Sequence, residues 1–555
     1  MKSFLQRNHR IVFYSAWLLL ALMQSALTEL KDDEAYYWVY SRYPAWGYYD
    51  HPPMIALMIR IGYFFFQNEF GVRIVAVIMN GLTLFFIEKL LVNKNPRLFY
   101  AIALSILAFQ VNGFIAAPDI PLIFFTAVFF GCYKNFIEKI SLINTICLGV
   151  CAALLLYTKY QGALIILFTL ISNPKLFTRH QTYLAGTITL LCLMPHLWWQ
   201  YQHDWISLRY HLFESNVNPY RLSFTLEYLI GQVLIAGPFA GFILLPAAFL
   251  YKPSNTTENA LRFTFIGIYS VFLLSSLRGK TEANWTAPVL VSLMVLSHDY
   301  LNSNIKWRSA IYKLLPLSLI VTLFARIIMI ADFLPIRFVK EQYHSWRGWP
   351  AEMKTRTKNL PVVFNNSYQR ASKYWFYTGQ TTYSLNDYRS RKNNYNLWPI
   401  EDSMLGKQVY VLDIYDLYKF PDSLKTPLGW LGYRFDPSFV SFSKINISAS
   451  YKRYSLKAGE MLNLSCRVNI PPHYAEFITS HPTLYSEVFI GIFRTDGFIK
   501  NVFLPYSLQR INSKREFDIK FNPHLKKGKY YLKFAISAGN NIATHNSDKI
   551  PLVIE

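Results

Sequence analysis

The chain has 555 residues, of which 52% are hydrophobic, 17% aromatic and only 16% charged. This composition excludes an ordinary soluble domain over the first three-fifths of the chain. The formal net charge of +23 raises the question of a nucleic-acid partner, but long basic runs are lacking and many cations lie in short loops between apolar segments. Retention at an anionic membrane surface explains this charge better, so we expect no nucleic acid.

Apolar runs close to the ~20 residues needed to cross a bilayer recur along the first part of the chain. They predict a polytopic α-helical membrane protein with about eleven transmembrane helices. The predicted spans are residues 11–27, 71–92, 97–115, 119–137, 140–157, 160–173, 181–199, 226–250, 261–277, 285–300 and 309–331.

Loops rich in Lys and Arg alternate with loops that carry few of them. Because basic residues stay inside, this pattern predicts a cytoplasmic N-terminus and a C-terminal region on the outer, periplasmic side. The abundance of Asn, Lys, Tyr and Phe indicates a bacterium, and hence its cytoplasmic (inner) membrane. A cleaved signal peptide over residues 11–27 is the alternative, but Gln24-Ser25-Ala26-Leu27 makes a poor cleavage site.

The patterning predicts three domains. Residues 1–332 form a transmembrane catalytic domain with two large outer loops, 28–70 and 198–225. A small periplasmic α/β domain follows at 333–425, and regular short strands separated by turns predict a β-sandwich-like domain at 426–555. The strands expected in these two exported domains are 361–364, 381–385, 408–413, 445–454, 461–468, 486–493, 500–504, 516–521 and 529–536, with a helix at 367–378.

Cysteine usage limits cross-linking and metal binding. Four cysteines fall in predicted spans, and Cys466 stands alone in the C-terminal region. An exported region with one cysteine cannot close an internal disulfide, so it must be held together by packing. None of the cysteines has metal-ligand spacing.

The segment Lys31-Asp32-Asp33-Glu34 follows the first predicted span. Three carboxylates in a row beside a membrane are repelled by anionic headgroups, so we interpret them as part of a catalytic site. Asp119 lies at the outer start of the fourth span, and the predicted topology opens both segments on the same side. The carboxylates can therefore converge on one external cavity, although an N-cap role would explain Asp119 equally well.

A carboxylate near an acceptor hydroxyl can take its proton as the hydroxyl attacks the anomeric carbon of a sugar. A lipid-phosphate leaving group then needs cationic or hydrogen-bonding partners. Candidates in or beside the outer loops are His51, Lys159, His203, Arg209, Arg278 and Lys280. Each has a structural alternative: Lys159 could snorkel, His51 could be a turn residue before Pro52-Pro53, and Lys280 could be an ordinary loop cation.

The order of these motifs resembles the GT-C membrane glycosyltransferases, specifically family 39-like enzymes related to protein O-mannosyltransferases and lipid A aminoarabinose transferases. The matching segments over about residues 28–300 are Asp32-Asp33-Glu34-Ala35-Tyr36-Tyr37-Trp38, Trp46-Gly47-Tyr48-Tyr49-Asp50-His51-Pro52-Pro53-Met54, Ala117-Pro118-Asp119, Thr158-Lys159-Tyr160, Trp198-Trp199, Gln202-His203-Asp204-Trp205 and the run from Gly279 to Pro288. The final β region carries no such resemblance.

The resemblance implies a GT-C fold, a polyprenyl-phosphate sugar donor, inversion at the anomeric carbon and a lipid, glycan or protein acceptor. It assigns the catalytic base to Asp33 and the second acidic site to Asp119. Glu34, His51, Lys159, His203, Arg209 and Lys280 are the expected contacts to donor phosphate or substrate. Where aminoarabinose transferases have Lys-Pro-Pro this chain has His51-Pro52-Pro53. The permanent positive charge beside the phosphate then falls to Lys159 or Lys280.

We expect no cofactor. Asp33, Glu34 and His203 could supply metal ligands, but their spacing is not diagnostic, and we predict metal independence. A secondary transporter is the alternative from another class, yet the chain lacks paired hydrophobic halves. A polysaccharide ligase or polymerase would share the lipid-linked donor but would place its main catalytic loop late in the bundle.

Overall fold

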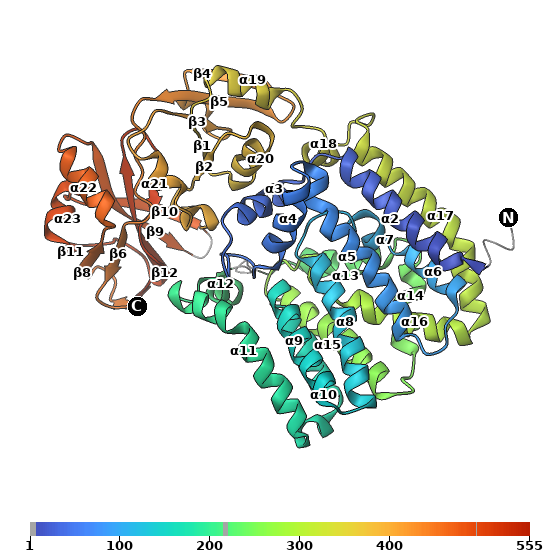
Figure 1. Cartoon of the computed structure of the whole chain (residues 1–555). Helices are drawn as coiled ribbons and strands as arrows, with labels where there is room; N and C mark the ends of the chain where they lie inside the picture. Colours follow the sequence, from blue (N-terminus) through green and yellow to red (C-terminus); the bar gives the residue numbers. More distant parts are fainter. Residues whose placement is uncertain (1–6, 215–219, 495–496) are drawn as a thin grey trace. The chain divides into compact units, whose positions relative to one another are not determined.

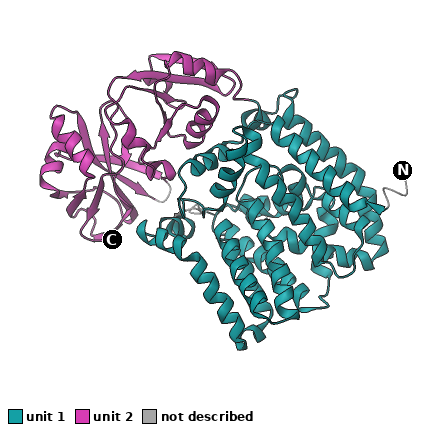
Figure 2. Ribbon diagram, viewed as in Figure 1, with its two compact units in different colours: residues 1–344 teal, residues 345–555 magenta. Residues whose placement is uncertain are grey.

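The computed structural model describes residues 7–214, 220–494 and 497–555. The chain forms two compact units, residues 1–344 (unit 1) and 345–555 (unit 2), shown in Figure 2. Unit 1 is helical, whereas unit 2 combines three sheets with short helices (Figure 1). The division falls after the predicted boundary at 332, because α18 (Arg337–Tyr343) packs through Tyr343 against the core of unit 1.

Unit 1 is a bundle of long helices with shorter helices beside them. Its α-helices are α2 (His9–Leu27), α3 (Asp32–Arg42), α4 (Met54–Phe65), α5 (Glu69–Leu90), α6 (Pro96–Ser105), α7 (Leu107–Val111), α8 (Asp119–Glu138), α9 (Leu142–Thr158), α10 (Gly162–Ser172), α11 (His180–Gln202), α12 (Ile206–Arg209), α13 (Leu222–Ala236), α14 (Gly241–Leu250), α15 (Thr256–Ser276), α16 (Val289–Ser303), α17 (Ile305–Ile330) and α18. Its main core is built from Leu, Ile, Val, Ala and Phe side chains of many of these helices.

Among the described helices, five are long and apolar enough to cross a membrane, and a sixth counts if the bent pair α13–α14 is one span. This is fewer than the number expected from the sequence. The predicted span 97–115 is interrupted at Ile106, which separates α6 from α7. The predicted span 226–250 bends by 95° between α13 and α14. The predicted spans 140–157, 160–173, 181–199 and 285–300 are the helices α9, α10, α11 and α16, which fall short in length or in hydropathy.

Gly237 explains the bend between α13 and α14. Its φ is +117°, a conformation that costs little only for glycine. A Cβ at this position would lie 2.3 Å from the carbonyl oxygen of Ser105, at the end of α6. The bend in one helix pair therefore rests directly against the break in the other.

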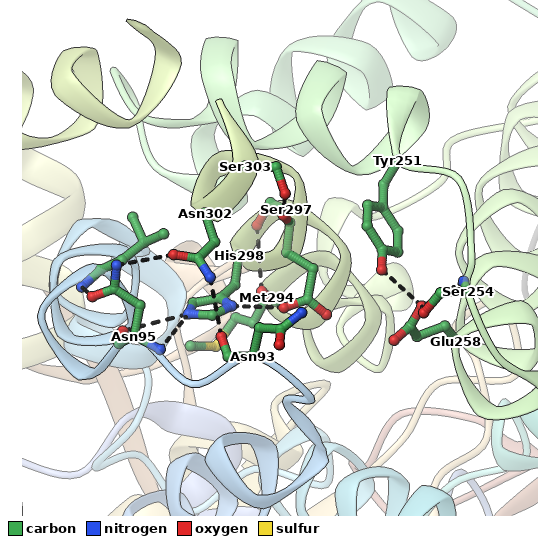
Figure 3. Close-up of polar contacts among 12 residues, drawn as sticks. Asn93, Asn95, Tyr251, Ser254, Glu258, Met294, Ser297, His298, Asn302 and Ser303 are labelled. Atoms are coloured by element: carbon green, nitrogen blue, oxygen red, sulfur yellow. Dashed lines mark hydrogen bonds and ion pairs between the residues drawn. The ribbon is translucent and has the colours of Figure 1, made fainter. Parts of the chain in front are cut away.

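Buried polar side chains fasten the helices at their predicted cytoplasmic ends (Figure 3). Asn95 caps α6 and its amide donates to Asn302 of α16 at 3.0 Å. His298, also on α16, pairs with Asp299 at 2.9 Å, and nearby Glu258 accepts from the Tyr251 hydroxyl at 2.7 Å. Polar groups in an apolar bundle are costly when unpaired. The Asn95–Asn302 bond ties α6 to α16, whereas the Glu258 contact holds the segment after α14 against the first turn of α15.

Unit 2 begins with a five-stranded sheet in the order β2-β1-β3-β5-β4. Its first three strands are parallel and connected through helices such as α20 (Tyr368–Thr378), as the predicted α/β domain requires. The sheet comprises β1 (Val362–Asn365), β2 (Thr382–Leu385), β3 (Val409–Asp413), β4 (Asp422–Thr426) and β5 (Gly429–Asp436). β5 lies beyond the expected domain boundary at 425 yet pairs with β3, so this sheet extends further along the chain than expected.

The rest of unit 2 contains a six-stranded sheet around β10-β9-β12-β14-β7 and a three-stranded sheet β11-β8-β6. The strands are β6 (Asn446–Ala449), β7 (Tyr454–Leu456), β8 (Leu462–Asn469), β9 (Ser486–Arg494), β10 (Gly497–Phe503), β11 (Glu516–Phe521), β12 (Gly528–Ala538), β13 (Thr544–His545) and β14 (Ile550–Ile554). Buried residues alternate along β8, and one hydrophobic cluster includes side chains from both sheets. Two sheets that share a core form the sandwich that the short strands predicted.

Candidate active site

The three carboxylates of the first outer loop form the first turn of α3. Asp32, Asp33 and Glu34 lie where the positive end of the helix dipole favours negative charge. The backbone N–H of Lys31 donates to Glu34 at 2.9 Å, which completes the start of the helix. Asp33 is exposed, whereas Glu34 is buried. Neighbouring acidic residues therefore face different surroundings.

Arg73 of α5 holds the buried Glu34. The two side chains form a bidentate pair, with Nε–Oε1 at 2.7 Å and Nη2–Oε2 at 2.5 Å, and both are fully enclosed. The remaining Arg73 donors bond the carbonyl oxygens of Ser25, Thr28 and Glu29. Burial by itself would raise the pKa of Glu34, but Arg73 and two backbone amides outweigh it and hold the pKa below its usual value.

The sequence predicts that Glu34 contacts the donor or the substrate. In the structure its carboxylate is instead paired with Arg73 inside the fold. Its oxygens are committed to Arg73 and to backbone N–H groups inside the fold, because an unpaired carboxylate would be costly there. One of those groups is the N–H of Ala116, at 2.8 Å. Ala116 lies three residues before Asp119, so the bond joins the segment that carries Asp33 to the segment that carries Asp119.

Asp119 begins α8 and is held from two other segments. Its Oδ1 accepts from Lys159 Nζ at 2.7 Å, and its Oδ2 accepts from Asn284 Nδ2 at 2.9 Å. Lys159 follows the last residue of α9, and its side chain is 8% exposed against 17% for Asp119. Lys159 is thus an ion-pair partner of Asp119 in a mostly buried setting. Neither the expected phosphate contact nor the snorkelling alternative included this ion pair.

His51 lies close to the face of α3 that carries Asp33. Its Nε2 is 3.1 Å from the hydroxyl of Tyr37. Tyr37 and Asp33 are four residues apart on α3, so they lie on the same side of that helix. The structure therefore brings the second motif of the loop, Asp50-His51-Pro52-Pro53, next to the acidic turn.

The two outer loops are fastened together by side chains that bond backbone oxygens. The His196 ring lies 2.6 Å from the Trp46 oxygen, the Ser207 hydroxyl donates to the Tyr48 oxygen at 2.6 Å, and His211 Nε2 is 2.7 Å from the Asp50 oxygen. Contact is so close that a Cβ on Gly47 would lie 2.3 Å from the Trp199 ring. Residues 215–219 of the second loop lie outside the described residues.

The other candidates lie in this second loop or beyond it. His203 stacks on Trp199 with ring centroids 4.1 Å apart, and its Nδ1 is 2.8 Å from the Trp199 oxygen. Arg209 ends α12 with an exposed side chain. Lys280 pairs with Glu282 at 2.9 Å, and the hydrogen bond that its ammonium donates to this half-exposed carboxylate raises the pKa of Lys280.

Sequence reasoning missed Arg73 and Asn284 as parts of this site. Asn284 lies inside the segment from Gly279 to Pro288 that carries the resemblance, so the sequence offered a reason to consider it. Arg73 had only the general signal of a charged residue within a predicted span, which marks a function or a partner. Across the described residues, no three His, Cys, Asp or Glu side chains are grouped so as to hold a metal ion.

Comparison with known proteins shows that part of the chain is similar to membrane glycosyltransferases. Residues 50–199, which include His51, Asp119 and Lys159 but not Asp33, match the family model described as dolichyl-phosphate-mannose-protein mannosyltransferase. The lipid A galacturonosyltransferase RgtD of Rhizobium johnstonii is 24% identical over 310 residues. That match covers 52% of this chain and 63% of the relative, which is less than two-thirds of the relative's length.

The fold is similar to that of ArnT from Cupriavidus metallidurans, solved with undecaprenyl phosphate and in the apo state. The TM-score is 0.55 at 12% identity, and the similarity covers 77% of this chain and 98% of ArnT. Part of the chain is thus similar in sequence to the mannosyltransferase model and to RgtD, and its fold is similar to that of ArnT.

Proposed function

We propose that the protein is an inverting glycosyltransferase that moves a sugar from a polyprenyl-phosphate donor to a lipid acceptor at the outer face of the bacterial cytoplasmic membrane. The observation that carries this proposal is the hydrogen bond from Ala116 to Glu34, which ties the acidic turn of α3 to the segment of Asp119. The undecaprenyl phosphate bound to ArnT supports the class of donor. The lipid A acceptor named for RgtD favours a lipid over a glycan or a protein.

Asp33 is the group we assign to proton removal. The acceptor hydroxyl attacks the anomeric carbon of the donor sugar, Asp33 takes the hydroxyl proton, and the bond from the sugar to the lipid phosphate breaks with its electron pair on the phosphate. An exposed carboxylate suits this step, because the acceptor must reach it. Glu34 cannot take the same part while Arg73 and the backbone occupy its oxygens.

Lys159 and Asn284 are the groups we assign to the leaving phosphate. Lys159 carries three N–H donors, and its bond to Asp119 uses one of them. Asp119 thereby fixes an ammonium group and an amide group near one point, where negative charge grows as the donor bond breaks. His51 and Arg209 are further donors that we assign to the donor or the acceptor.

The test compares Asp33→Asn with its neighbour Asp32→Asn. Membrane lipids from cells with and without the gene are compared by mass spectrometry, to find the lipid that loses a sugar when the gene is absent. We expect Asp32→Asn to restore the glycosylated lipid and Asp33→Asn to leave it absent, with equal amounts of both variants in the membrane. Full restoration by Asp33→Asn would contradict the proposal.

A further inference from the structure

The net positive charge of the chain is concentrated in unit 2. Residues 345–555 contain 29 Lys and Arg against 16 Asp and Glu, a net +13 out of the +23 of the whole chain. Retention of basic loops inside the cell does not explain this excess, because unit 2 lies beyond the last predicted span. The charge of unit 2 therefore needs an explanation of its own.

Three loops at one end of the sandwich carry five Lys and Arg residues against a single acidic residue, Glu460. β8 begins at Leu462, which pairs with the last residue of β11, so loops 457–461 and 522–527 start side by side. The amide of Asn522 donates to the Gly459 oxygen at 2.8 Å. The backbone of Glu555 bonds Leu456 at 2.9 Å, which brings the end of β14 to the same place. Loop 450–453 lies beside them, since Ser450 bonds the Ser465 oxygen of β8.

We call this region the basic end. Its cations are exposed, and no ion pair is found for them within the described residues. They are Lys452, Arg453, Lys457, Lys520, Lys526, Lys527 and Lys529. The nearby acidic side chains serve local structure instead: Glu460 accepts from the Lys457 backbone at 2.7 Å, and Glu555 accepts from the Ser455 hydroxyl at 2.7 Å. The basic end thus carries seven exposed cations against the two exposed carboxylates of Glu460 and Glu555.

Two large side chains project from the same loops. Tyr451 is 69% exposed and Met461 is 43% exposed, although both types of residue usually find cover in a folded domain. Exposed aromatic and apolar side chains among cations are typical of surfaces that meet a lipid headgroup layer. A soluble polyanion would be bound by the cations and would gain little from either of these side chains.

We propose that the basic end binds the anionic phospholipid headgroups of the membrane that holds unit 1. Unit 2 follows α17 within fifteen residues, so the lipid surface is always within a short distance of it. Because unit 2 is covalently attached to unit 1, the lipid is present at a high local concentration. Even weak binding of lipid by the basic end is then sufficient. The attraction acts over about 10 Å at moderate salt, which requires the loops to lie at the headgroups.

The test uses the full-length protein in nanodiscs made either of phosphatidylcholine or of a mixture with phosphatidylglycerol. Exposed lysines are acetylated with a membrane-impermeant reagent, and the rate at each lysine is measured by mass spectrometry. We expect Lys526 and Lys527 to react about threefold more slowly in the anionic nanodiscs, with the protection lost at high salt. Lys407 and Lys425, which are exposed on the α/β part of unit 2, should react equally in both lipids.

Two variants and a competitor complete the test. The double variant Lys526→Glu/Lys527→Glu should lose the protection at Lys457, whereas the matched variant Lys407→Glu/Lys425→Glu should keep it. Equal labelling of the basic end in both lipids would overturn the proposal. Protection by soluble dextran sulfate without any dependence on phosphatidylglycerol would overturn it as well, since the surface would then be one for a polyanionic chain.

Discussion

The contrast between Asp33 and Glu34 shows how strongly the role of a residue depends on partners far along the chain. The two are adjacent and chemically alike, and the sequence alone assigned both to the site. Arg73, which lies 39 residues after Glu34, decides between them by enclosing one carboxylate in a bidentate pair. The Asp33 side chain stays exposed on α3.

We predict that Arg73→Met destabilises unit 1 by about 3–5 kcal/mol, because it leaves the buried Glu34 carboxylate and several backbone oxygens without their partner. The double variant Arg73→Met/Glu34→Gln should be more stable than Arg73→Met alone, since it removes the charge that was left unpaired. Thermal unfolding of the purified protein in detergent measures both. A double variant less stable than Arg73→Met would show that the pair does not act as a unit.

Asp119→Asn should lower sugar transfer by about a hundredfold or more, because Lys159 loses the carboxylate that fixes its position near the reacting groups. Lys159→Met should cause a loss of similar size, and the double variant should be little worse than either one. Initial rates of lipid glycosylation in isolated membranes measure these effects. Full activity of Asp119→Asn would show that Asp119 acts only as a helix cap.

The sequence singles out Asp33, Asp119 and His51, because each lies in a motif with a recognisable order and predicted membrane position, and their roles stay predictions. The sequence did not predict which of the candidate side chains pair with one another. Lys159 and Asp119 were each singled out for separate reasons, whereas the structure makes them partners at 2.7 Å. Contacts between distant helices depend on how the helices pack, and a single sequence contains no direct record of that packing.

At the scale of elements, the apolar pattern predicted most helices of unit 1 but not their interruptions. The run 97–115 is apolar throughout its first part, and only its packing separates α6 from α7 at Ile106. In unit 2, β8 alternates buried and exposed residues and β11 matches its predicted range. The sequence did not predict β4, β5, β13 and β14, and the predicted strand 445–454 is two strands, β6 and β7. Short strands bounded by turns leave a local signal, and helix breaks inside an apolar run do not.

Gly237→Ala should destabilise unit 1 by about 2 kcal/mol or more, because the new methyl group meets the Ser105 oxygen and the backbone keeps a positive φ. Gly131→Ala in α8 is the matched control, since nothing lies within 4 Å of its Cβ. It should be neutral or stabilising by up to ~1 kcal/mol. Thermal unfolding in detergent compares the two variants. Equal unfolding midpoints would contradict the role of Gly237 in the bend.

At the scale of the whole molecule, the candidate site and most of the excess positive charge lie in different units. Unit 1 carries every candidate site residue, from Asp33 to Asn284. Unit 2 carries more than half of the net charge in fewer than half of the residues, +13 of +23. The pattern of basic loops predicts that the two ends of the chain lie on opposite sides of the membrane.

This topology predicts the outcome of reporter fusions. Alkaline phosphatase, which is active only outside the cytoplasm, should be active when fused after Glu555 and inactive when fused after Lys94, in the loop between α5 and α6. The enzyme activity of each fusion is divided by its amount in the membrane. Activity of the Lys94 fusion would reverse the orientation and would move the acidic turn of α3 to the cytoplasmic face.

Unit 2 contains a single cysteine, Cys466, whose side chain is buried in β8 among the apolar residues shared by both sheets of the sandwich. A strand-borne thiol in that position has no partner with which to form an internal cross-link in its own unit. With this unit on the predicted outer side of the membrane, we expect its folding to be independent of thiol-oxidising enzymes. A strain that lacks those enzymes should accumulate the protein at its normal level, even where other envelope proteins are degraded.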